Sequence, residues 1–126
     1  SEMTARRAMT NVAIKQDTVS VMAIDEDHLS RQTFGDATLA REVLTLFIDQ
    51  CAADGPRLSH LAPCERSALA HRLKGAARGI GAFRLAATLE TIERADSFGG
   101  AARALAAFTV AHREAETAAR SLIART

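Results

Sequence analysis

Hydrophobic side chains recur every three or four residues along most of the chain after residue 25. Beyond Asp36 the apolar positions follow at steps of four, three, four, seven and three, at Ala40, Leu44, Phe47, Cys51, Leu58 and Leu61. This spacing puts them on one face of an α-helix. Gly55-Pro56 interrupts the face, and because the apolar phase continues past the proline we expect a kink there rather than a full break.

Residues that start or stop helices divide the rest of the chain. Acidic residues at 25–27 predict the start of a short helix that ends near residue 33, and Asp36 can cap the next helix. Pro63 suits the first turn of a third helix, which Gly79 and Gly81 end. Two more helices are predicted over 82–96 and 101–125, with a turn over 97–100.

The short connections make neighbouring helices antiparallel. We therefore predict an all-α fold for residues 25–126, an up-down-up-down four-helix bundle with a short additional N-terminal helix. Residues 1–24 show no sustained period. They are expected to form a weakly structured N-terminal extension.

Composition narrows the class of protein. The 126 residues are 48% hydrophobic and 25% charged, with a net charge of +1, which is typical of one soluble domain. The near-neutral charge argues against nucleic-acid binding. No apolar stretch is long enough to span a membrane, and no signal peptide is recognisable, so we expect a cytoplasmic protein without membrane contact. Cys51 and Cys64 are expected to be reduced and buried.

Enzyme-like motifs are missing from the sequence. It contains no Glu-x-x-His pair of the di-iron type and no zinc-type spacing of His and Cys, so we expect no metal site. It has neither a nucleophile elbow nor a phosphate-binding loop. The small size also argues against a self-contained enzyme with its own cofactor fold.

The candidate chemistry lies on one helix face, which Ser67, His71, Lys74, Gly75 and Arg78 share. His71 is predicted to point outward, where its Nε2 is a usable nucleophile near neutral pH. Lys74 could reach back as a mobile positive charge. Gly75 leaves room for a docking partner, or else marks close helix packing. The same residues could also form an ordinary solvated face.

The string His71-Arg72-Leu73-Lys74-Gly75, followed by Gly81-Ala82, resembles the signature of the histidine phosphotransfer (HPt) domain of multistep His-Asp phosphorelays. Leu85-Ala86 and Leu89-Glu90 fit the next helix of that family. The resemblance implies a four-helix bundle in which His71 is the phosphoacceptor. Lys74 then stabilises the phosphoryl group, and Gly75 provides docking space.

The resemblance also implies a phosphoryl carrier with no kinase activity of its own. It would take a phosphoryl group from a receiver-domain aspartate and pass it to another, as a monomer with no cofactor, the receiver supplying Mg²⁺. Residues 62–84 hold five basic residues and one acidic residue, a net charge of +4, while the rest of the chain sums to −3. This basic segment suits an acidic receiver surface. The expected partner-binding residues are Ser67, Arg72, Arg78 and Arg84.

The sequence leaves two alternatives to the HPt interpretation open. One is the dimerisation and phosphoacceptor domain of a sensor histidine kinase, although Arg72 stands where that family has an acid and no proline follows closely. The other is a helical adaptor that binds a receiver without transferring phosphate.

Overall fold

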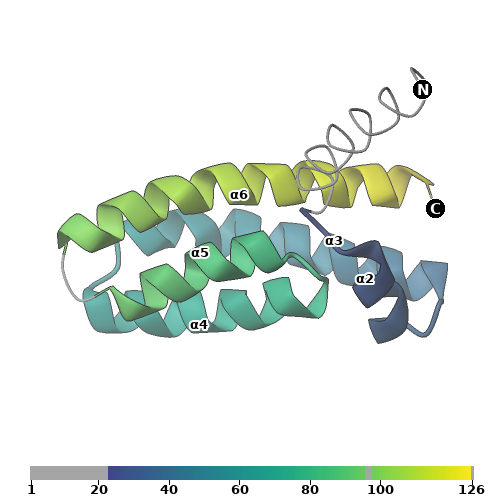
Figure 1. The fold of residues 1–126 in the computed structure, drawn as a ribbon, viewed down its shortest axis with the longest axis horizontal. Helices are drawn as coiled ribbons and strands as arrows, with labels where there is room; N and C mark the ends of the chain where they lie inside the picture. The colour runs from purple at the N-terminus through teal and green to yellow at the C-terminus, as the bar shows by residue number, and fades with distance from the viewer. Residues whose placement is uncertain (1–22, 96–97, 126) are drawn as a thin grey trace, which may run out of the picture.

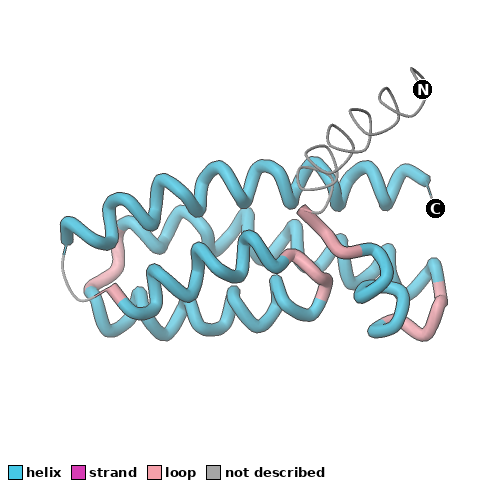
Figure 2. Tube along the Cα trace, in the orientation of Figure 1, coloured by secondary structure: helices cyan, strands magenta, loops and turns pink. Residues whose placement is uncertain are grey.

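The computed structural model describes residues 23–95 and 98–125. Its elements, in chain order, are α2 (Glu26–Gln32), α3 (Ala37–Asp54), the 3₁₀-helix η1 (Gly55–Ser59), α4 (Pro63–Gly79), α5 (Phe83–Arg94) and α6 (Phe98–Arg125). The four long helices lie side by side, and α2 lies near one end of the bundle (Figure 1). The described residues contain helices and short connections but no strand (Figure 2). The predicted all-α bundle with a short additional helix is confirmed.

The predicted N-terminal extension falls outside the described residues as far as residue 22. Ala23 and Ile24, however, are buried, and Ile24 belongs to the hydrophobic core. The packed domain therefore begins at least two residues earlier than the sequence pattern predicts.

The predicted helix starts are confirmed by their caps. Asp25 Oδ1 accepts a hydrogen bond from His28 N at 3.0 Å, and Asp36 Oδ1 accepts one from Leu39 N at 3.1 Å. Each carboxylate satisfies an amide that has no partner within its helix. Pro63 is the first residue of α4, where its missing N–H costs no hydrogen bond.

Two predicted features differ from the structure. The α-helix ends at Asp54 and continues as the tighter η1, so Pro56 does more than kink it. Leu58 is nevertheless fully buried, because the 3₁₀ path keeps the apolar face turned inward. The turn predicted over 97–100 is also wrong from Phe98 onward, where α6 has already begun. Each glycine lowers helix stability by only about 1 kcal/mol, and burial of Ala101 offsets part of that cost.

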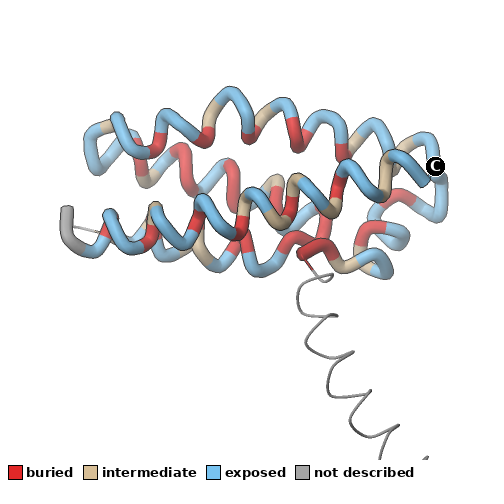
Figure 3. Tube along the Cα trace, turned by 90° about the horizontal axis from the view of Figure 1, so that it is seen from above, coloured by how far each residue is buried: buried red, intermediate tan, exposed pale blue. Residues whose placement is uncertain are grey.

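The core runs along the axis of the bundle, where buried positions of all four long helices face one another (Figure 3). Helix α4 packs most extensively against α5. Small side chains make this possible, since Ala70 and Ala77 of α4 and Ala86 of α5 are buried and let the two backbones come close.

The two cysteines differ in their surroundings. Cys51 is fully buried in the core, where desolvation raises the pKa of its thiol to about 12. Cys64 is exposed in the first turn of α4, so the prediction that it is buried is wrong. It lies on the side of α4 opposite the buried Leu69, Leu73 and Ala77.

Helix α2 is held to the bundle by a backbone contact at Gly81. The Asp25 amide donates to the Gly81 carbonyl at 2.9 Å, and Gly81 has a φ of +83°. A Cβ at this position would lie 2.7 Å from Asp25 O. Both the left-handed backbone and the close approach therefore require glycine here.

We expect Gly81→Ala to destabilise the domain by about 1–3 kcal/mol, because alanine strains the positive φ and collides with Asp25 O. Gly79→Ala is the matched control, since nothing lies within 4 Å of a Cβ there. That change should be neutral or stabilise by up to about 1 kcal/mol. Urea unfolding followed by circular dichroism measures both, and equal stabilities would contradict the assigned role of Gly81.

Candidate functional site

His71 lies in the middle of α4 with 66% of its side chain exposed, so the prediction that it points outward is confirmed. Its Nδ1 lies 2.9 Å from Oε2 of Glu93, on α5. When Nδ1 carries the ring proton it donates this hydrogen bond, and Nε2 then keeps a lone pair. Nε2 has no hydrogen-bond partner among the described residues. The arrangement favours an imidazole with a nucleophilic Nε2 at the surface.

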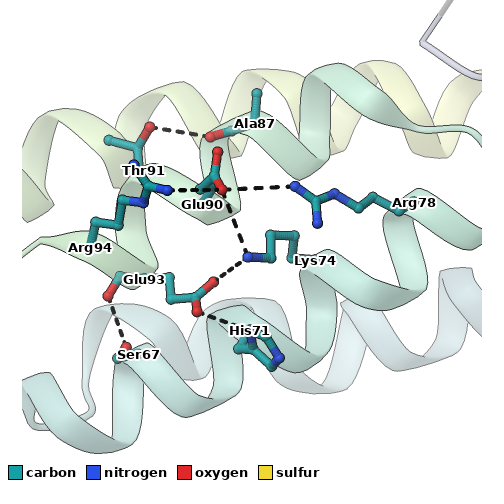
Figure 4. A network of polar contacts seen from close by, with 9 residues as sticks. All are labelled: Ser67, His71, Lys74, Arg78, Ala87, Glu90, Thr91, Glu93 and Arg94. Carbon is teal, nitrogen blue, oxygen red and sulfur yellow. Dashed lines mark hydrogen bonds and ion pairs between the residues drawn. The ribbon is translucent and has the colours of Figure 1, made fainter.

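Glu93 is the residue that joins the site together, and the sequence pattern did not single it out. Its Oε2 accepts from His71, and its Oε1 lies 2.7 Å from Lys74 Nζ (Figure 4). The hydrogen bond from Lys74 has the largest effect and lowers the pKa of Glu93, burial opposes it, and the hydrogen bond from His71 lowers the pKa by a smaller amount. Glu93 is therefore ionised at neutral pH.

Lys74 is buried, so it is neither the mobile charge nor part of the ordinary solvated face that the sequence left open. Only 10% of its side chain is exposed, and its ammonium is paired with Glu93. The physical reason is the close packing of α4 on α5, which covers the aliphatic stem and leaves only the ammonium to find a partner. Lys74 is thus a fixed charge beside His71.

A second carboxylate, Glu90, lies one turn before Glu93 on α5. Its Oε1 is 3.9 Å from Lys74 Nζ, 3.8 Å from Arg78 Nη2 and 3.5 Å from Arg94 Nη2. These separations are long, so each pair is weak and partly screened by water. Together the three cations and two carboxylates form one cluster across α4 and α5, with a formal net charge of +1, and Glu93 connects this cluster to His71.

The residues predicted to provide docking space or to bind a partner differ in their surroundings. Gly75 is exposed with nothing within 4 Å of a Cβ, which excludes close helix packing as its reason and leaves open space beside His71. Arg72 is exposed, and Arg78 is half-exposed two turns along α4. Arg84 pairs with Glu114 of α6 at 3.1 Å, away from the Glu93 cluster.

The side chain of Ser67 already makes a hydrogen bond within the fold. Its hydroxyl donates to the Glu93 carbonyl at 2.8 Å. That carbonyl is one of the last of α5 and has no partner in its own helix. The bond therefore fastens the end of α5 to α4 at the residue that holds His71.

A sequence signal for the two carboxylates does exist. Glu90 and Glu93 are three residues apart, so they share a face of α5 beside the buried Leu89 and Ile92. In an antiparallel pair, this end of α5 lies opposite the basic part of α4. An excess of positive charge on one helix indicates acidic partners on its neighbour.

The described residues provide neither a metal-binding cluster nor a membrane-spanning helix. They contain no cluster of three or more His, Cys, Asp and Glu side chains arranged to hold a metal ion. No helix among residues 23–95 and 98–125 is both long and apolar enough to cross a membrane.

The fold and site define a class of protein: a four-helix bundle of one chain in which an exposed histidine is held by a carboxylate that also pairs with a buried lysine. No protein-family model matches the chain. No curated protein matches it. Among solved structures, it is similar to the histidine phosphotransferase ShpA from Caulobacter crescentus, with 39% sequence identity and a TM-score of 0.53. The match covers 79% of this chain and 98% of that one.

At this identity and coverage the family is established. The chain belongs to the histidine phosphotransferases, the HPt family that its motif resembles.

Because the pKa of Glu93 is lowered in the folded state, the stability of the fold should depend on pH. A carboxyl whose pKa is lower in the folded state stabilises the fold above its unfolded pKa of about 4.5, and this contribution is lost as the pH falls through the folded value. The wild type should therefore be more stable than Glu93→Gln at pH 7. The difference should shrink below about pH 4.5. Urea unfolding of both proteins across this range tests it, and a difference independent of pH would contradict it.

Proposed function

We propose that this protein is a phosphoryl carrier in a phosphorelay, in which His71 Nε2 takes a phosphoryl group from a receiver-domain aspartate and delivers it to another. The observation that carries the proposal is the hydrogen bond between His71 Nδ1 and Glu93 at 2.9 Å on an exposed ring. That bond holds the ring in the tautomer and orientation that the reaction needs. Membership of the histidine phosphotransferase family supports the same role.

In the proposed transfer, the Nε2 lone pair attacks phosphorus while the bond from phosphorus to the aspartate oxygen breaks. The aspartate leaves as a carboxylate, and His71 keeps its Nδ1 proton. The imidazole therefore gains positive charge during the attack, and Glu93 faces that charge at Nδ1. Reaction in the opposite direction returns the phosphoryl group by the same path.

Most of the catalysis in this proposal comes from positioning and charge neutralisation in the docked complex. The receiver would supply Mg²⁺ and the acidic pocket. Arg72 and Arg78 on α4 and Arg94 on α5 are exposed, and they suit an acidic partner surface. Open space at Gly75 lets the partner approach the ring. The distant Arg84, already paired with Glu114, has less support as a docking residue.

The first test is His71→Gln with His60→Gln as its control, since both residues are exposed histidines. We expect His71→Gln to abolish uptake of acid-labile phosphate from a panel of phosphorylated receiver domains. It should change stability by no more than about 0.5 kcal/mol. His60→Gln should accept phosphate like the wild type. Phosphate uptake by a folded His71→Gln protein would refute the proposal, and a wild type that takes up none would favour the adaptor.

The sensor-kinase alternative predicts a different oligomeric state. That domain builds its four-helix bundle from two chains, whereas here four long helices of one chain enclose a continuous core. We therefore propose a monomer. Light scattering coupled to gel filtration should give a mass near 13.4 kDa. A dimer that persists on dilution would instead favour the alternative.

A further inference from the structure

The carboxylate of Glu93 has two partners at once. Oε2 accepts from His71 Nδ1 at 2.9 Å, while Oε1 pairs with Lys74 Nζ at 2.7 Å. Among the described residues Lys74 has no second close partner, because Glu90 Oε1 is 3.9 Å away. In the unphosphorylated protein the buried ammonium is thus already neutralised by Glu93.

A phosphoryl group on His71 would change this balance. It brings negative charge to Nε2, one helical turn from Lys74. Arg78 and Arg94 are the other cations of the cluster, but both are exposed and lie near Glu90. The ammonium of Lys74 is the most buried positive charge in the cluster, and it would interact with a phosphoryl group through a less screened medium.

We propose that Glu93 and the phosphoryl group of phospho-His71 compete for Lys74, so that the charge of Glu93 limits how strongly this protein retains its phosphoryl group. The inference rests on the proposed function. Glu93 acts here as a positioning residue. It orients His71 before transfer, and after transfer it keeps Lys74 from pairing fully with the phosphoryl group. A lysine with no carboxylate partner would hold the phosphoryl group more tightly.

The test uses phosphoramidate as a small phosphoryl donor, so that no partner protein is needed. Nε2 attacks phosphorus as the phosphorus–nitrogen bond of the donor breaks, ammonia leaves, and Nδ1 keeps its proton. At a fixed ratio of phosphoramidate to ammonium, the phosphorylated fraction measured by ³¹P NMR reports the equilibrium.

We expect Glu93→Gln to shift this equilibrium toward phospho-His71 by about tenfold, within the range of measured coupling energies. Glutamine keeps the shape of the side chain and an oxygen to accept from Nδ1, but it removes the charge. Glu90→Gln is the matched control, because it removes a charge from the same helix face without touching His71, and it should shift the equilibrium much less. An unchanged equilibrium in a folded Glu93→Gln protein would overturn the inference.

Two further measurements separate competition for Lys74 from simple repulsion by Glu93. Lys74→Met should lower the phosphorylated fraction, and in that background Glu93→Gln should lose most of its effect. If Glu93→Gln kept its full effect in the Lys74→Met background, the proposed competition for Lys74 would be overturned.

The wild type gives an independent readout, because Lys15 and Lys74 are the only lysines in the chain. Phosphorylation should shift the side-chain ¹⁵N signal of Lys74 and leave that of Lys15 in place. An unmoved Lys74 signal in the phosphorylated protein would refute the proposed competition for Lys74, even if Glu93→Gln did not fold. Failure of the proposed function looks different, since no phosphorylated receiver domain would then transfer its phosphoryl group to His71, whatever phosphoramidate does.

Discussion

The close packing of α4 against α5 is the constraint on which the site depends. Alanines on the facing surfaces bring the two backbones together, and this closeness covers the stem of Lys74. A buried ammonium needs a partner, and Glu93 lies within 2.7 Å on the opposing helix. The same carboxylate then reaches His71. The orientation of an exposed histidine is thus fixed by packing beneath it, and Ser67 fastens the helix end that carries Glu93.

Much of this architecture could be predicted from the sequence, because helix periodicity and capping act over a few residues. Asp25, Asp36 and Pro63 mark helix starts through local hydrogen bonding alone. The features that were missed depend on contacts between helices. Whether α6 could begin at Phe98 depended on the burial of Ala101, and whether Cys64 was exposed depended on how α4 faces its neighbours.

The candidate site likewise has one part that a single helix predicts and another part that depends on contacts between helices. A single helix face was enough to select His71, Lys74 and Gly75, because all three lie within five residues of one another on α4. Glu93 is 22 residues from His71, and its role requires the antiparallel register of α4 and α5. The burial of Lys74 has the same origin. A helical wheel treats each helix as if it had one buried and one solvated face, whereas α5 covers the edge between them.

The charge of residue 93 has a consequence that a neutral hydrogen-bonding side chain would lack. A carrier must accept a phosphoryl group and then give it up, so tight binding of the phosphorylated state is a disadvantage. An unopposed buried lysine beside His71 would stabilise phospho-His71 and slow its discharge. In the proposed carrier, Glu93 would orient the ring for attack and would also supply Lys74 with an alternative partner. A carboxylate at this position would therefore favour reversible transfer over storage, at the cost of a less stable phosphorylated state.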